Sequence, residues 1–204
     1  MKNNISNKLD SIIKDPKCTL DYSKDYELLI AVMLSAQSTD KRFNIVTKEL
    51  FKYSLEELRD MELTKLENII KPVGTHHKKA IFIKNIADSL IKDYNGVVPN
   101  NRKYLESLNG IGHKSTNVVL SELFKEPAIA VDTHVSRVSK RLGLAKEKDN
   151  VLEIEKKLEK SFDKEKWGKT HLQLVAFGRN ICKAKKPECK NCPFNSEECK
   201  KPLN

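Results

Sequence analysis

Residues 108–120 read LNGIGHKSTNVVL, and the two glycines in this stretch decide the fold. Gly110 and Gly112 permit a tight turn with positive φ. Residues 104–108 end one helical pattern, and His113 begins another whose apolar residues share one face. The stretch therefore predicts a helix-hairpin-helix.

The predicted turn indicates what this stretch could bind. Backbone N–H groups around Gly110, Ile111 and Gly112 would stand beside a helix N-terminus, which suits a DNA phosphate and reads no base. Glycines that merely pack an ordinary helical hairpin would give the same pattern. Lys114 is harder to explain, because the partial positive charge of a helix N-terminus disfavours a cation. Its position calls for a chemical reason.

Length and charge narrow the class of protein. The 204 residues can bury one good core or two small ones. Lys and Arg number 38 against 28 Asp and Glu, so the formal net charge is +10. A polyanion such as nucleic acid is the natural partner, although a solvated basic surface would have the same composition.

The sequence lacks the features of a membrane protein. Its N-terminus, MKNNISNKLD, has no apolar signal core, and the longest apolar run, residues 28–34, is far too short to span a bilayer. We expect a soluble, cytoplasmic protein with no membrane partner, associated with the nucleoid if it is prokaryotic.

Helical patterns occur almost everywhere, and no segment reads convincingly as a strand. Ser54 with Glu57, and Thr64 with Glu67, each have the spacing of a capping box that opens a short helix. Breaks carrying Pro, Gly or clustered polar residues separate the periodic segments. The sequence therefore predicts a compact all-α protein.

Four of the five cysteines crowd into the last part of the chain in the pattern C-x6-C-x2-C-x6-C. They are Cys182, Cys189, Cys192 and Cys199, while Cys18 stands alone. Such crowding argues against a disulfide framework and for a metal site. Four thiolates can hold either a zinc ion or an iron–sulfur cluster, and spacing alone does not separate the two.

A basic loop lies between the first two of these cysteines. Lys183, Lys185 and Lys186 could grip backbone phosphates, or they could form a solvated charge run.

A second candidate site lies at residues 131–138, VDTHVSRV, where Asp132 follows a short apolar segment. Asp is a favoured N-cap, and capping a helix would be reason enough for it. A functional carboxylate is compatible with the same position.

Taken together, these motifs resemble the endonuclease III family of helix-hairpin-helix DNA glycosylases and AP lyases. The resemblance rests on MLSAQSTD at 33–40, the hairpin at 108–119, IAVDTHVSRV at 129–138, HLQLVAFGR at 171–179 and the terminal cysteines. It implies two helical domains with a DNA-binding cleft between them. The six-helix domain with the hairpin would cover residues 18–126, and the N-terminal helix, residues 1–17, would join the cluster domain, residues 127–204.

The resemblance also implies a mechanism. Such an enzyme binds double-stranded DNA as a monomer, flips an oxidised pyrimidine out of the duplex and attacks the sugar C1′ with an amine, which Lys114 matches. The base leaves, and the imine then undergoes β-elimination; an abasic site is also a substrate. A helix N-terminus in a partly desolvated cleft favours the neutral amine that attack requires. Asp132 matches the carboxylate that stabilises the developing sugar cation.

Further residues take their roles from the resemblance. The four terminal cysteines would bind a [4Fe–4S] cluster, although the last spacing is one residue longer than usual. Gln37 would fill the gap left by the flipped nucleotide, and Thr75 stands where a leucine often acts as a second wedge. Asn109 replaces the usual proline of the hairpin, and His113 replaces a common arginine, which weakens one DNA contact or makes it pH-dependent.

Two other functions remain open at this point. A monofunctional glycosylase would lack the lysine and usually carries an extra C-terminal domain. A non-catalytic helix-hairpin-helix DNA-binding module with a structural zinc would have no need of the pair formed by Lys114 and Asp132.

Overall fold

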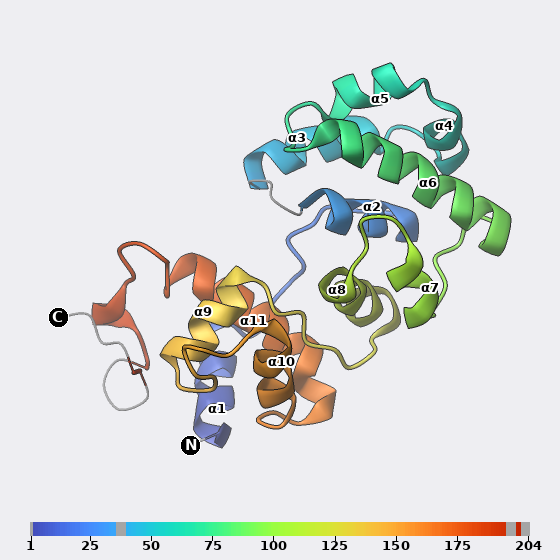
Figure 1. Cartoon of the computed structure of the whole chain (residues 1–204). Coiled ribbons are helices and arrows are strands. Elements are labelled where there is room, and N and C mark those ends of the chain that lie inside the picture. The colour runs from blue at the N-terminus through green and yellow to red at the C-terminus, as the bar shows by residue number, and fades with distance from the viewer. Residues whose placement is uncertain (1, 36–39, 195–198, 201–204) are drawn as a thin grey trace. The chain divides into compact units, whose positions relative to one another are not determined.

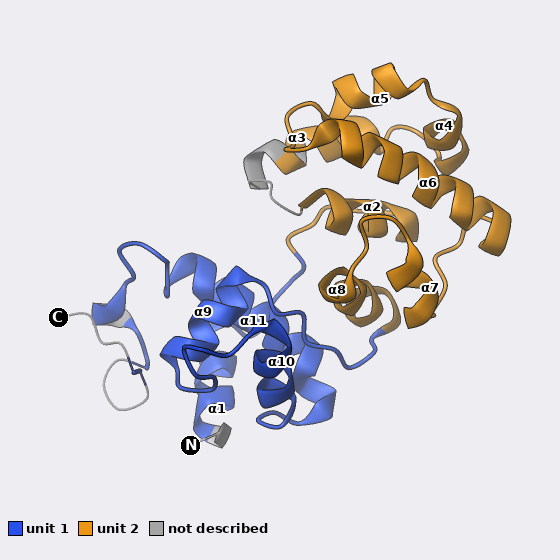
Figure 2. Ribbon diagram, in the orientation of Figure 1, with its two compact units in different colours: residues 1–18, 125–204 blue, residues 19–124 orange. Residues whose placement is uncertain are grey.

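The computed structural model describes residues 2–35, 40–194 and 199–200, and within these ranges all regular structure is helical. The predicted all-α class is confirmed. The chain forms two compact units (Figures 1 and 2). Unit 1 contains residues 1–18 and 125–204, and unit 2 contains residues 19–124.

Unit 2 is the helical body that carries the hairpin. Its helices are α2 (Asp25–Ser35), α3 (Asp40–Leu50), α4 (Leu55–Asp60), α5 (Leu63–Ile70), α6 (His76–Tyr94), α7 (Arg102–Ser107) and α8 (His113–Phe124). The long helix α6 packs against α4 and α5, while α2 packs against α8. Every residue from Tyr26 to Leu34 is buried, so α2 is the central helix of this unit, as its continuous apolar run requires.

Unit 1 joins the N-terminal helix to the last part of the chain. Its elements are α1 (Lys2–Ile12), α9 (Thr133–Arg141), α10 (Val151–Glu159), η1 (Lys164–Lys166), α11 (Trp167–Asn180) and η2 (Cys189–Asn191). Ile5 and Leu9 of α1 are buried in a core that also contains Leu174 and Phe177 of α11. Phe194 completes this core by meeting Phe177 edge to face, with ring centroids 5.3 Å apart.

Polar contacts reinforce the attachment of α1 to α11. The Asp10 carboxylate accepts hydrogen bonds from Lys169 Nζ at 2.5 Å and from Gln173 Nε2 at 3.0 Å, and Gln173 also donates to the Ile13 carbonyl. The hydrogen bond from Lys169 lowers the pKa of Asp10 below its ordinary value. Residues more than 150 positions apart in the sequence are thereby fixed to each other.

One of the two predicted capping boxes is present. The Ser54 hydroxyl accepts the Glu57 N–H, and the Glu57 carboxylate accepts the Ser54 N–H at 2.7 Å. The prediction for Thr64 and Glu67 is wrong, because α5 begins at Leu63 with Glu62 as its N-cap residue and no side-chain cap. Thr64 donates to Glu62 instead, and Glu67 pairs with His77 of α6 at 3.0 Å.

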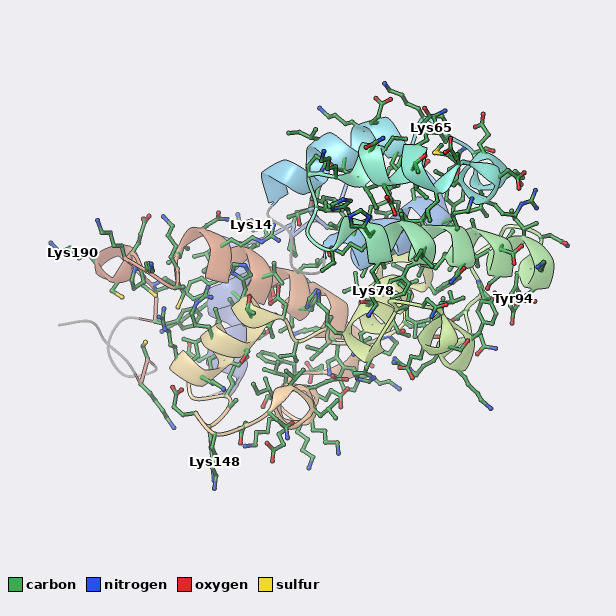
Figure 3. All side chains as sticks on the ribbon, turned by 45° about the horizontal axis from the view of Figure 1, so that its top comes forward. Lys14, Lys65, Lys78, Tyr94, Lys148 and Lys190 are labelled. Atoms are coloured by element: carbon green, nitrogen blue, oxygen red, sulfur yellow. The ribbon has the colours of Figure 1, made fainter. Side chains whose placement is uncertain are left out.

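None of the described helices combines the length and apolar character needed to cross a bilayer. Many lysines extend from the surface, among them Lys148 and Lys190 of unit 1, which are labelled in Figure 3.

Candidate active site

The helix-hairpin-helix predicted from the sequence is formed by α7, the turn at 108–112 and α8. Gly110 has a φ of +82°, in the region that favours glycine. The Ile111 N–H donates to the Leu108 carbonyl at 3.1 Å, and the Thr116 N–H donates to the Gly112 carbonyl at 2.9 Å. The turn is therefore closed by backbone hydrogen bonds, and α8 starts directly after it.

The two glycines have different surroundings. A Cβ at Gly110 would lie 2.6 Å from Phe82 Cδ2 of α6 and 3.0 Å from Met33 Cγ of α2. A Cβ at Gly112 would meet nothing within 4 Å. Gly110 therefore serves packing, which is the alternative that the sequence offered for the hairpin glycines. The backbone at Gly112, in contrast, is open to solvent. Ile111 is buried and its N–H donates to the Leu108 carbonyl, so the exposed backbone that follows it is that of Gly112.

The turn is held by side chains on both sides. Asn109, which replaces the proline of the family pattern, accepts a hydrogen bond from Asn85 Nδ2 of α6 at 3.2 Å. His113 Nδ1 lies 3.2 Å from the carboxylate of Glu106 on α7, and Arg102 pairs with the same oxygen. The amide contact connects the turn to α6.

Lys114 is the second residue of α8 and is half-buried. The next turn inward contains Thr116 and Asn117, which are both buried. Lys114 therefore lies at the start of α8, two residues after the exposed Gly112 and two residues before the buried Thr116.

Asp132 is the N-cap of α9, as the sequence predicts. Its Oδ1 accepts the Val135 N–H at 2.8 Å, and its own backbone is extended. The cap fixes the carboxylate at the start of a helix whose inner face, Val135 and Val138, is buried in the unit 1 core. Lys114 belongs to unit 2 and Asp132 to unit 1, and each is placed within its own unit.

Two arginines of α9 connect it to the cysteine segment, and sequence analysis missed both. Arg137 donates to the carbonyls of Gly178 and Cys182, and burial lowers the pKa of its guanidinium. Arg141 donates from Nη1 to Cys182 Sγ at 3.3 Å and to the Lys183 carbonyl at 2.8 Å. Their spacing of four residues on one helix face was the available signal.

The cysteine segment keeps its thiols at least partly shielded from solvent. Cys182 is buried and the other three terminal cysteines are half-buried. Burial raises the pKa of the Cys192 thiol, and the charges of Cys182, Cys199 and Cys189 raise it further. Among the described residues, no three Cys, His, Asp or Glu side chains are grouped closely enough to bind a metal ion as they stand.

The basic loop is partly neutralised. Lys183 pairs with Glu188 at 2.6 Å, whereas Lys185 and Lys186 are exposed. Lys186 has a φ of +50°, so the loop turns sharply at this residue.

The structure describes one of the two predicted wedge residues. Thr75 is exposed directly before α6 with a φ of +56°, and its hydroxyl donates to the Gly74 carbonyl. Gln37 lies outside the described residues.

Comparison with known proteins agrees with this geometry. Residues 30–164 match the HhH-GPD superfamily base excision DNA repair protein model. Endonuclease III from Bacillus subtilis (strain 168) is 47% identical over 93% of this chain and 87% of that protein. The chain belongs to the endonuclease III family.

Solved endonuclease III structures extend the match to the fold. A trapped endonuclease III–DNA covalent intermediate, in an estranged-adenine complex, is 45% identical with a TM-score of 0.89, covering 95% of this chain and 93% of that one. A non-covalent endonuclease III–DNA complex is 44% identical with a TM-score of 0.93, covering 98% and 95%.

Proposed function

We propose that this protein is a bifunctional DNA N-glycosylase and AP lyase of base excision repair that removes oxidised pyrimidines, with Lys114 as its nucleophile. Membership in the endonuclease III family supports the activity and DNA as the partner. One observation supports Lys114 as the nucleophile. Lys114 lies in the first turn of α8, in a chain that is similar to an enzyme solved as a covalent DNA intermediate.

The chemistry assigned to Lys114 runs through a covalent imine. The neutral amine attacks C1′ of the damaged nucleotide, and the bond to the base breaks with its electron pair leaving on the base. The C1′–O4′ bond then breaks, O4′ takes up a proton and the nitrogen loses its protons, which gives the imine. Loss of a proton from C2′ then expels the 3′-phosphate by β-elimination, and hydrolysis of the imine releases the enzyme.

The role assigned to Asp132 is electrostatic. Its carboxylate carries the negative charge that stabilises the sugar cation as the base departs, and it helps the amine shed its proton. Capping of α9 restricts the carboxylate to one orientation, so little reorganisation is needed during the reaction.

DNA is held, in this proposal, mainly through its backbone. The open backbone at Gly112 can approach a phosphate, and Lys185 and Lys186 add positive charge from unit 1. Gln37 and Thr75 would occupy the stack opened by the flipped nucleotide. We also propose that the protein acts as a monomer.

The hairpin glycines provide a matched test of backbone binding. Gly110→Ala is expected to destabilise the protein by about 1–3 kcal/mol, since the new methyl collides with Phe82 at positive φ. Gly112→Ala should change stability by less than about 1 kcal/mol, yet weaken DNA binding about tenfold by obstructing one phosphate. Thermal unfolding and fluorescence anisotropy measure the two effects. Unchanged DNA affinity in Gly112→Ala would contradict a phosphate site at this turn.

The terminal cysteines fit a [4Fe–4S] cluster by their chemistry. Cys182, Cys189, Cys192 and Cys199 would hold it, since none of the four is exposed and an Arg141 N–H already reaches the sulfur atom of Cys182. When bound, such a cluster supplies a cross-link through iron and a centre capable of electron transfer. In the protein itself, Arg141 holds the Cys182 end of the segment to α9.

The purified protein is therefore expected to be brown and to contain iron and sulfide. Cys18→Ser should keep the full iron content, because Cys18 lies in the segment before unit 2 and outside the terminal pattern. Cys192→Ser should lose it. Elemental analysis of anaerobically prepared protein that found zinc alone would overturn the assignment.

Borohydride trapping separates the proposed function from its alternatives. A bifunctional enzyme forms an imine on a duplex with one oxidised pyrimidine or one abasic site. Borohydride reduces this imine, which leaves a stable covalent complex of enzyme and DNA. A monofunctional glycosylase would release base without trapping, and a non-catalytic DNA-binding module with structural zinc would do neither. Matched duplexes with single lesions would also establish the base preference.

A further inference from the structure

Lys79 is a buried lysine in the first turn of α6, a position where its own helix offers it no electrostatic stabilisation. It is 5% exposed, and its backbone N–H donates to the Thr75 carbonyl at 3.1 Å. Burial lowers the pKa of its ammonium group. A cation near a helix N-terminus and away from water carries a free-energy cost, so its partner must compensate.

That partner is the C-terminal end of α2. Lys79 Nζ donates to the Leu34 carbonyl at 2.9 Å, while the Ser35 hydroxyl donates to the Val32 carbonyl at 2.8 Å. The last carbonyls of a helix have no intrahelical donor and carry partial negative charge. Lys79 therefore caps α2 and binds its final turn to the first turn of α6.

The same two helix ends support the hairpin. Met33, adjacent to Leu34, and Phe82, one turn after Lys79, are the side chains that a Cβ at Gly110 would strike. The Gly110 turn thus rests on a seat formed by these two side chains. Lys114 follows Gly110 by four residues at the beginning of α8.

We propose that Lys79 is a positioning residue, which holds the seat under Gly110 together and thereby sets the place of Lys114. This inference rests on the proposed function of Lys114. Because a displacement of about 1 Å in a reacting group can reduce a rate about a hundredfold, a small opening between α2 and α6 should affect the covalent step. Binding to the DNA backbone should be much less sensitive.

The chain provides a matched control in Lys84, on the same helix. Lys84 is also partly buried, and it donates to the carbonyls of Arg59 and Met61 at the end of α4. It caps a helix just as Lys79 does, but α4 contributes no side chain to the seat under Gly110. A role limited to helix capping would make the two lysines equivalent in their effect on catalysis.

The experiment compares Lys79→Met with Lys84→Met in the full chain. Both variants should unfold at lower temperature than the parent. Lys79→Met should slow single-turnover cleavage of abasic DNA about tenfold or more, and by a larger factor than it raises Kd for undamaged duplex, because Lys185 and Lys186 of unit 1 also contribute to binding. Lys84→Met should keep both quantities. Amide hydrogen exchange without DNA should rise in the hairpin, residues 108–114, only for Lys79→Met.

Equal cleavage rates and equal hairpin exchange in the two variants would overturn the positioning role. If Lys79→Met does not fold, Lys79→Gln keeps an N–H donor without the charge and is judged by the same two measurements. Failure of the parent to be trapped by borohydride would count against the proposed function alone, because the exchange comparison needs no activity.

Discussion

Lys114→Arg is expected to fold and to bind DNA, yet to form no borohydride-trapped complex and to leave abasic DNA uncut. A guanidinium remains protonated and cannot form the imine, although it keeps the positive charge at the start of α8. Lys114→Gln should behave in the same way. Gel analysis of trapped complexes and of strand cleavage measures the loss, and anisotropy measures the retained affinity.

A second interpretation of Lys114 makes the opposite prediction. If the ammonium group merely grips a phosphate, arginine should replace it with nearly full activity, because guanidinium binds phosphate well. The helix N-terminus does not distinguish these roles, since a DNA phosphate can bind there in either case. An active Lys114→Arg enzyme that still cuts abasic DNA would contradict the imine mechanism.

Local sequence signals predicted the parts of the site that depend on neighbouring residues. Gly110 adopts positive φ, and Asp132 caps α9, because backbone conformation and capping are decided within a few residues. The order of the hairpin, the VDTHVSRV motif and the terminal cysteines also identified the family. These features required no knowledge of contacts distant in the chain.

The sequence was less informative where distant segments compete for a side chain. Glu67 has capping-box spacing to Thr64, but it pairs with His77 of α6. Likewise, nothing in the run HHKKA separates Lys78 from Lys79, although the first is exposed and the second is buried against α2. Burial and partner choice depend on tertiary packing, which local patterns do not encode.

Contacts across the cysteine segment were hidden for the same reason. Arg141 and Cys182 are more than 40 residues apart, and their hydrogen bond depends on how the segment after α11 folds back on α9. The cysteine spacing alone indicated a metal-binding site and left the metal open. The arginine contact adds a cationic donor at one sulfur atom, a feature that suits a negatively charged cluster.

Asp132→Asn is expected to reduce turnover about a hundredfold or more while leaving the fold intact. The substitution removes the negative charge that stabilises the sugar cation, and interactions of this type are worth about 2.7–4 kcal/mol in the transition state. An asparagine side chain can still accept the Val135 N–H, so α9 should keep its cap. Single-turnover base release and thermal unfolding measure the two properties.

Asp132→Ala separates charge from capping. It removes both, so it should match Asp132→Asn in activity but unfold more easily, by about 0.5–2 kcal/mol, the usual contribution of an N-cap side chain. If Asp132 were only a cap, the order of activity would change: Asp132→Asn would be nearly as active as the parent, and any deficit in Asp132→Ala would follow its stability. Normal base release by Asp132→Asn at a temperature well below its unfolding would therefore exclude the carboxylate from the chemistry.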